Sequence, residues 1–317
     1  MIELKQLFKE RMRKLLNEKD FQKFLDTIKI PPVNSIRCNT LKISPEKLKT
    51  KLESKAWKIE QPFPEFPEIM IIASKLQPGE LGRSLEHLLG YYYVQEIASM
   101  LPILALKPKE NEFILDLCAA PGSKTTQMSA KMGNTGAIIA NEVSLGRIKI
   151  LAANTERCGV MNEVISKKDG VILCDKFRKA NILFDKILLD APCSGEGTLR
   201  SSERNSKTWN LNTIKRMSYL QKTLFEAAFE CLKQGGEIVY STCTHAPEEN
   251  EEIVNFALER FKDKIQIEKI SLPVKCRQGI TEWDNKKYSN ELKKACRVYP
   301  QDNNTEGFFL AKFRRLK

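Results

Sequence analysis

Two cysteines stand out because each follows a short apolar run and lies in a small polar motif. Cys193 lies in Asp190-Ala-Pro-Cys-Ser-Gly195, and Cys243 lies in Ser241-Thr-Cys-Thr244. Each is just past the carboxyl end of a predicted strand, which in a parallel sheet covered by helices is the ligand side. A cysteine thiolate is a strong nucleophile. We therefore expect the two thiols to converge on one reacting group.

Such a pair suits methylation at C5 of a pyrimidine, which by itself is a poor nucleophile. A thiolate that adds to C6 turns the ring into an enamine-like species, and its C5 can attack a methyl sulfonium. A carboxylate near N3 assists by stabilising the protonated ring, and Asp190 is the candidate. A free thiol has a pKa of about 8.5 and needs positive charge nearby, which Lys124 or the sulfonium supplies. The alternative is two buried structural cysteines, which the paired positions disfavour.

A methyl donor needs its own site, and the loop after the apolar run Phe113-Ile-Leu-Asp-Leu117 is the candidate. Residues 123–132 have the pattern of a helix, so the motif is strand, tight loop and helix, the place where nucleotides bind in open α/β sheets. With the single glycine Gly122, the loop matches neither the dinucleotide motif nor the phosphate loop. It suits a nucleoside better than a pyrophosphate. An ordinary strand–helix turn is the alternative interpretation.

Two carboxylates complete a set that fits a nucleoside. Glu142 ends the second predicted strand, twenty residues after Gly122, where a carboxylate accepts hydrogen bonds from ribose hydroxyls. Asp169 follows the third strand and is placed to meet the adenine amino group. Each is a weak signal alone, because acidic residues commonly end strands. Together with the loop they favour S-adenosylmethionine over NAD.

These residues are positioned by an alternation of strands and helices that becomes regular after a helix predicted from Tyr92 to Leu106. Strands are predicted at 113–117, 137–141, 164–165, 184–189, 237–241 and 307–313, and helices at 123–132, 144–158, 211–233 and 248–261. Alternating strands and helices predict an α/β fold with a doubly wound, Rossmann-like parallel sheet.

The first 80 residues have a different character. An amphipathic, basic helix is predicted within 1–26, strands at 35–41, 57–59 and 69–72, and a Lys-rich helix from Ser44 and Pro45 to about residue 55. This pattern predicts a small N-terminal α+β module at 1–80, with the catalytic domain at 81–317. RNA docking and simple capping of the larger domain both remain open as its role.

Basic residues outnumber acidic ones in this chain of 317 residues. There are 52 Lys and Arg against 40 Asp and Glu, a formal net charge of +12 at pH 7. Such an excess favours a polyanionic partner, with nucleic acid first. The other interpretation is a solvated basic surface that only aids solubility.

The nine cysteines are scattered without C-x-x-C spacing, and the chain has two histidines. This argues against a zinc site and against a small disulfide scaffold, so we expect most of the cysteines to be small buried hydrophobic residues. No apolar run approaches the length of a membrane span, and the N-terminal residues lack the apolar segment of a secretory signal. We therefore expect a soluble, cytoplasmic protein without a metal ion.

Three motifs in order resemble those of the NOP/Sun family of RNA cytosine-5 methyltransferases: Leu115-Asp-Leu-Cys-Ala-Ala-Pro-Gly-Ser-Lys124, Asp190-Ala-Pro-Cys-Ser-Gly195 and Tyr240-Ser-Thr-Cys-Thr244. The resemblance covers roughly residues 35–313. It implies Cys243 as nucleophile, Cys193 in product release and an RNA-recognition-like N-terminal module. The residues it implies for S-adenosylmethionine binding are Cys118, Ala119, Ala120, Pro121, Gly122, Ser123, Lys124, Glu142, Arg147, Asp169 and Asp190. The family often has Gly-Gly-Lys where this chain has Gly122-Ser-Lys124.

The expected function is therefore transfer of a methyl group to C5 of a cytosine in RNA, by a monomer. We expect tRNA ahead of rRNA, because no RNA-binding domain is appended beyond the N-terminal module. Three other classes fit less well. A DNA cytosine-5 methyltransferase would use Cys193 as nucleophile and has no need of the Ser-Thr-Cys-Thr motif, an NAD-dependent oxidoreductase lacks its loop, and a non-catalytic RNA-binding protein has no need of both cysteines with Asp190 and Lys124.

Overall fold

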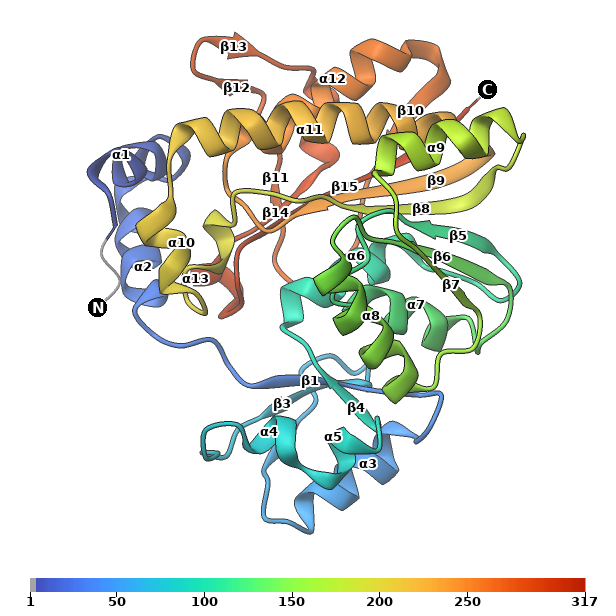
Figure 1. Ribbon diagram of the computed structural model, residues 1–317. Helices are drawn as coiled ribbons and strands as arrows, with labels where there is room; N and C mark the ends of the chain where they lie inside the picture. Colours follow the sequence, from blue (N-terminus) through green and yellow to red (C-terminus); the bar gives the residue numbers. More distant parts are fainter. Residues whose placement is uncertain (1–3, 317) are drawn as a thin grey trace. The chain divides into compact units, whose positions relative to one another are not determined.

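The computed structural model describes residues 4–316, which fold into two compact units (Figure 1). The first unit consists of the chain up to Pro32, of Ala191–Glu226, and of the chain from Val239 onward. The second unit consists of Val33–Asp190 and Ala227–Ile238. Among the described residues, no helix is both long enough and apolar enough to cross a membrane.

The second unit contains a parallel sheet in the order β8-β5-β6-β7, with the start of β9 beside β8. The strands are β5 (Phe113–Asp116), β6 (Ala137–Asn141), β7 (Glu163–Ser166), β8 (Phe184–Asp190) and β9 (Leu232–Thr242). The helices between them are α7 (Ser123–Lys131), α8 (Leu145–Cys158) and α9 (Gly170–Lys179), and α6 (Ile97–Leu106) precedes β5. Fully buried residues such as Ile114, Leu115 and Ile187 form the core of the sheet.

A small antiparallel sheet in the same unit has the order β2-β3-β1-β4. Its strands are β1 (Ser35–Cys38), β2 (Ile59–Glu60), β3 (Ile69–Ile72) and β4 (Tyr92–Val94), accompanied by α3 (Pro45–Glu53), α4 (Glu80–Arg83) and α5 (Leu85–Leu88). Helix α3 begins as predicted, with the Ser44 side chain accepting a hydrogen bond from the Lys47 N–H. Ile36, Leu48 and Tyr92 belong to the apolar core of this layer.

The first unit combines helices with antiparallel strands. Its helices are α1 (Gln6–Leu15), α2 (Glu18–Ile28), α10 (Glu203–Thr208), α11 (Leu211–Glu230), α12 (Glu251–Phe261) and α13 (Pro300–Asn303). Its strands are β10 (Ile265–Glu268), β11 (Arg277–Gln278), β14 (Cys296–Val298) and β15 (Phe308–Arg315). They lie in the order β11-β14-β15-β9, and β10 pairs with β15. A separate hairpin consists of β12 (Glu282–Trp283) and β13 (Lys286–Lys287). Phe8, Phe24 and Trp209 are buried in one apolar cluster.

The Rossmann-like α/β fold is confirmed, in a mixed rather than purely parallel form, because β10, β11, β14 and β15 pair in antiparallel fashion. Three predicted elements were wrong in detail. The helix within 1–26 is two helices, since the Asn17 side chain caps α2 by accepting from the Asp20 N–H, and residues 1–3 of that range lie outside the described residues.

The helix predicted from Tyr92 starts later. Aromatic and β-branched residues favour a strand, and Tyr92–Val94 pairs with β1. Helix α6 begins only at Ile97, with the Glu96 side chain accepting from two backbone N–H groups. The helix predicted at 211–233 ends earlier, because α11 ends at Glu230 and β9 begins at Leu232. Gly235 and Gly236 lie inside that strand.

Candidate active site

The loop between β5 and α7 contains small apolar residues that are buried. Ala119 and Ala120 belong to a buried cluster with Ala140 and Leu151. Gly122 caps the start of α7 with a φ of 99°, a conformation that favours glycine, and a Cβ there would lie 3.0 Å from Cδ1 of Leu151. The loop is therefore apolar and closely packed, which suits a flat base rather than a chain of phosphates.

A buried arginine that the sequence analysis did not single out holds the start of α7. Arg37, on β1, is only 1% exposed. It donates hydrogen bonds to the Ser123 carbonyl oxygen at 2.6 Å, to Thr126 Oγ1 at 2.8 Å, and to Gln95. Burial lowers the pKa of Arg37 to about 10, which still leaves it charged at neutral pH. The small sheet thus fixes the helix that follows the loop.

Glu142, Arg147 and the loop are brought together. Glu142 follows β6 directly and is 3% exposed. One carboxylate oxygen accepts a hydrogen bond from the Ser144 N–H at 2.9 Å, and the other lies 2.8 Å from Arg147 Nη1. Arg147 in turn donates to the Ala120 carbonyl oxygen at 2.5 Å. The carboxylate predicted for a ribose therefore lies next to the loop predicted for the nucleoside.

Lys124 and Asp190 form an ion pair with 2.9 Å between Nζ and Oδ2. Lys124 also donates to Ser99 Oγ at 2.9 Å. Nearby in sequence, Asp116 ends β5, and its Oδ2 accepts a hydrogen bond from Thr125 Oγ1 at 2.7 Å. Burial raises the pKa of Asp116 to about 7. The carboxylate proposed for N3 of a pyrimidine is thus held by the lysine of the loop.

The remaining predicted residues of this unit have structural contacts. Asp169 caps α9 by accepting from the N–H groups of Val171 and Ile172 at 2.9 and 3.1 Å. The loop before it is tied to the end of β6, because the Asn141 amide donates to the Lys168 carbonyl oxygen at 3.0 Å. Cys118 is partly buried, and burial raises the pKa of its thiol more than the neighbouring charges do.

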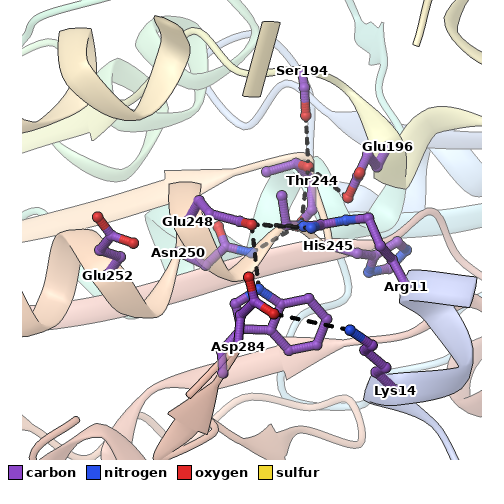
Figure 2. A network of polar contacts seen from close by, with 12 residues as sticks. Arg11, Lys14, Ser194, Glu196, Thr244, His245, Glu248, Asn250, Glu252 and Asp284 are labelled. Carbon is purple, nitrogen blue, oxygen red and sulfur yellow. Dashed lines mark hydrogen bonds and ion pairs between the residues drawn. The ribbon is translucent and has the colours of Figure 1, made fainter. Parts of the chain in front are cut away.

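In the first unit the two motif cysteines meet. Their sulfur atoms lie 3.1 Å apart, and both residues are partly exposed. The hydrogen bond with Cys243 and then burial raise the pKa of Cys193 well above that of a free thiol. The residues that follow them are also joined, because Ser194 Oγ and Thr244 Oγ1 lie 2.9 Å apart (Figure 2). Sequence position at two strand ends was therefore enough to pair these thiols.

Buried acids around the cysteines were missed. Glu196, 3% exposed, accepts from Trp209 Nε1 at 2.7 Å. It also accepts from Thr244 Oγ1 at 3.2 Å (Figure 2). Glu249, 0% exposed, accepts from the Ser194 N–H at 3.0 Å. The signal was the acidic run after Cys243, which resembles the solvated start of a helix. Only the fold reveals that part of that run points inward.

The other cysteines behave in two ways. Cys38, Cys158, Cys174 and Cys231 are buried, as expected of small hydrophobic residues. Cys276 and Cys296 form a disulfide, which their spacing did not indicate. Within residues 4–316, no cluster of three or more His, Cys, Asp or Glu side chains is arranged to hold a metal ion.

Comparison with known proteins agrees with this geometry. The family model described as 16S rRNA methyltransferase RsmB/F matches residues 103–314, and the model for the N-terminal domain of 16S rRNA methyltransferase RsmF matches residues 4–97. The tRNA (cytosine(49)-C(5))-methyltransferase of Pyrococcus abyssi is 42% identical over 96% of this chain and 94% of its own length. Ribosomal RNA small subunit methyltransferase F of Vibrio atlanticus is 38% identical over 94% of this chain, which spans only 60% of that relative.

Two solved structures from Pyrococcus horikoshii are similar over almost the whole chain. A methyltransferase homologue has a TM-score of 0.86 at 33% identity and covers 99% of this chain and 96% of its own. NSun6 with SFG has a TM-score of 0.82 at 26% identity and covers 99% and 98%. With these matches beside the loop and the paired cysteines, the chain belongs to the RsmB/F (NOP/Sun) family of RNA methyltransferases.

Proposed function

We propose that this chain transfers a methyl group from S-adenosylmethionine to C5 of a cytosine in RNA, with tRNA ahead of rRNA as substrate. The observation that carries the proposal is the pair Cys193 and Cys243, with 3.1 Å between their sulfur atoms. The family supports RNA methylation. The tRNA relative, which this chain matches over 94% of its length, supports tRNA, whereas the chain spans 60% of the rRNA relative from Vibrio atlanticus.

The second unit has a donor set that fits S-adenosylmethionine. The closely packed apolar loop suits adenosine, Glu142 offers carboxylate oxygens to ribose hydroxyls, and α7 begins at the loop, where a helix N-terminus favours a carboxylate. Residues proposed to hold the cofactor are Cys118, Ala119, Ala120, Pro121, Gly122, Ser123, Lys124, Glu142, Arg147, Asp169 and Asp190. When bound, this cofactor supplies an electrophilic methyl group.

In the proposed mechanism Cys243 is the nucleophile. Its thiolate forms a bond to C6 of cytosine, and the electrons of the C5–C6 double bond become available at C5, which takes the methyl group. Asp190 stabilises the ring protonated at N3 during this addition. Lys124, paired with Asp190 at 2.9 Å, holds that carboxylate in place.

Release reverses the addition. The proton on C5 passes to a base, the C5–C6 double bond re-forms, and the bond from C6 to sulfur breaks with its electron pair returning to Cys243. N3 then loses the proton that it gained in the addition. We assign Cys193 to this step, as a group that takes part in removing the C5 proton and expelling the thiol. The 3.1 Å between its sulfur and that of Cys243 supports this assignment.

Single substitutions separate the two roles in a methyl-transfer assay with bulk tRNA. Cys243→Ser is expected to abolish turnover and to form no lasting adduct, because a hydroxyl is far less nucleophilic than a thiolate. Cys193→Ala is expected to methylate once and stay bonded to its product, visible as a slow band on a denaturing gel that RNase shortens. The double variant is expected to show no such band. An adduct in the Cys243 variant and none in the Cys193 variant would assign the nucleophile to Cys193 instead.

Ribosomal RNA is the second candidate substrate, favoured by the relatives that act on the small subunit. Bisulfite sequencing of RNA from cells lacking this gene identifies the substrate, because the unmethylated cytosine appears in tRNA or in rRNA. We further propose that residues 1–80 form an RNA-recognition-like module, that 81–317 form the catalytic domain, and that the chain acts as a monomer in the cytoplasm. The separate family matches on either side of residue 100 support a division of this kind.

A further inference from the structure

Glu249 and Gln221 hold the backbone on both sides of Cys193. Both side chains are 0% exposed. Gln221, on α11, donates through Nε2 to the Pro192 carbonyl oxygen at 2.8 Å and to Glu249 Oε2 at 2.9 Å. The same carboxylate oxygen accepts from the Ser194 N–H at 3.0 Å. The residues immediately before and after Cys193 are therefore fixed by one buried amide and one buried carboxyl group.

Glu249 is itself held in position. It ends the short 3₁₀ helix η2 (Pro247–Glu249), and its carbonyl oxygen accepts a hydrogen bond from the buried Tyr240 hydroxyl at 2.5 Å. Among the described residues, its Oε1 is buried without a hydrogen-bond partner. An unpaired oxygen on a fully buried acid is costly, so its presence calls for an explanation. Thus the acid cannot move away from the cysteine loop without breaking several buried contacts.

The Glu249 carboxylate is joined to the loop of Cys193, because it accepts from the N–H of the next residue, Ser194. The two sulfur atoms lie 3.1 Å apart, so one thiol donates to the other, and a thiolate state of the pair retains one proton between them. The hydrogen bond with Cys243 raises the pKa of Cys193 most, followed by burial and by the charge of Cys243. Negative charge on Glu249 raises this pKa further. Burial raises the pKa of Glu249 to about 7, and the neighbouring Glu196 adds to this. The carboxylate is therefore charged above about pH 7.

We propose that Glu249 is a positioning residue for Cys193, which together with Gln221 fixes the cysteine loop and by its negative charge keeps the shared proton on Cys193, leaving Cys243 as the thiolate. This inference rests on the proposed function, because it explains which of the two thiols attacks. It assigns no bond-forming role to Glu249. The titratable groups that interact with Glu249 are Cys193, Glu196 and Tyr240, while Ser194 and Gln221 are neutral.

Alkylation with iodoacetamide tests the assignment without RNA or cofactor, since the thiolate reacts and the thiol does not. Trypsin cleaves after Lys186, Arg200, Lys233 and Arg260, which places the two cysteines in separate peptides for mass spectrometry. In the unmodified chain, the ratio of labelling at Cys243 to labelling at Cys193 is expected to rise between pH 6 and pH 8, as Glu249 ionises.

Glu249→Gln keeps the size and an acceptor for the Ser194 N–H but removes the charge. It is expected to lower the labelling ratio at pH 8 by about tenfold, the change that corresponds to one pKa unit. Glu252→Gln is the matched control, because Glu252 lies on the adjoining helix and pairs with Lys222 and Lys286; its ratio is expected to equal that of the unmodified chain.

An unchanged ratio in folded Glu249→Gln would overturn the proposal. Should this variant not fold, the pH series on the unmodified chain decides, and a ratio that stays constant from pH 6 to pH 8 overturns it equally. Absence of methyl transfer to any RNA would remove the proposed function while leaving the labelling result to stand, so the two failures are distinguishable.

Discussion

Asp116 and Glu249 are buried carboxyl groups in different units, and burial raises the pKa of each to about 7. A folded state that holds a proton more tightly than the unfolded chain becomes more stable as pH falls. His245 acts in the opposite direction. Burial, with a contribution from Arg297, lowers its pKa to about 3, so its contribution to stability is lost as pH falls below about 6.5. Single variants are therefore needed to separate these groups.

Asp116→Asn isolates one of them, because asparagine mimics the uncharged acid and still accepts from Thr125. The free energy of unfolding of the unmodified chain contains a contribution from Asp116 that rises as pH falls from about 7 towards 4, by up to about 1.4 kcal/mol per pH unit. The variant lacks it. The free energy of unfolding is measured in urea at several pH values. The value for the variant, relative to that of the unmodified chain, is expected to increase as pH rises from 4 to 7. A constant difference would mean that Asp116 is not protonated in this range.

Glu142 carries the ribose assignment. Glu142→Ala is expected to weaken binding of S-adenosylhomocysteine by about 1.5–3 kcal/mol, the contribution of a hydrogen bond to a charged group. Calorimetry measures this directly. Glu142→Gln is the control for local structure, since it keeps an acceptor for the Ser144 N–H. Unchanged affinity in the alanine variant would remove the ribose assignment, whatever the result with RNA.

Four of the site residues predicted from the sequence lie at strand ends or just after them. Glu142, Asp190, Cys193 and Cys243 could be located from the alternation of strands and helices alone, because parallel strands present their carboxyl ends on one side. Arg37 and Glu249 could not. Their partners lie far away in sequence, 86 residues for Arg37 with Ser123 and 55 for Glu249 with Ser194, and nothing local distinguishes them from solvated charges.

At the scale of elements, the sequence predicted helices and strands correctly where residues within the element itself determine its structure. Ser44 and Pro45 marked the start of α3, and the predicted strand 137–141 is β6. Errors arose where tertiary pairing decided. Tyr92–Val94 forms a strand because β1 is beside it, and Gly235-Gly236 continues β9 although glycine usually interrupts elements. In both cases membership of a sheet decided the element, and the partner strands lie elsewhere in the sequence.

Arg37 links two elements, β1 and α7, and predicts a measurable coupling between them. Arg37→Met keeps an unbranched side chain but leaves the Ser123 carbonyl and Thr126 hydroxyl without their buried donor. We expect a loss of roughly 2–4 kcal/mol in the free energy of unfolding, measured in urea. Weaker binding of S-adenosylhomocysteine is expected as well, because α7 starts at the loop that we propose for the cofactor.

Arg178→Met is the matched control, since Arg178 lies in the same unit on α9 with 55% of its side chain exposed and pairs with the nearby Asp175. Its effect on the free energy of unfolding is expected to be much smaller than that of Arg37→Met, as for surface substitutions generally. Equal losses in the two variants would contradict the role given to Arg37, and would make the effect one of charge rather than of buried contacts.

At the scale of the whole molecule, charge is the property that bears on the substrate. The formal net charge of +12 is spread along the chain and is independent of the motifs, so it supports nucleic-acid binding by a separate route. Composition alone left a solvated basic surface open. The salt dependence of RNA affinity distinguishes these two interpretations. Only a basic surface that contacts phosphates releases counterions when RNA binds.

Binding of tRNA is therefore expected to weaken steeply with salt, because each neutralised phosphate releases condensed counterions and the logarithm of the affinity falls linearly with the logarithm of salt concentration. For six to ten contacts, affinity falls by about 10³–10⁵ between 50 and 200 mM salt on double-stranded nucleic acid. Filter binding with Cys243→Ser measures this without turnover. S-adenosylhomocysteine, a small ligand without phosphates, serves as the control, and its affinity is expected to change little. A flat salt dependence for tRNA would mean that the excess of 12 charges is surface solvation and that RNA is held by other contacts.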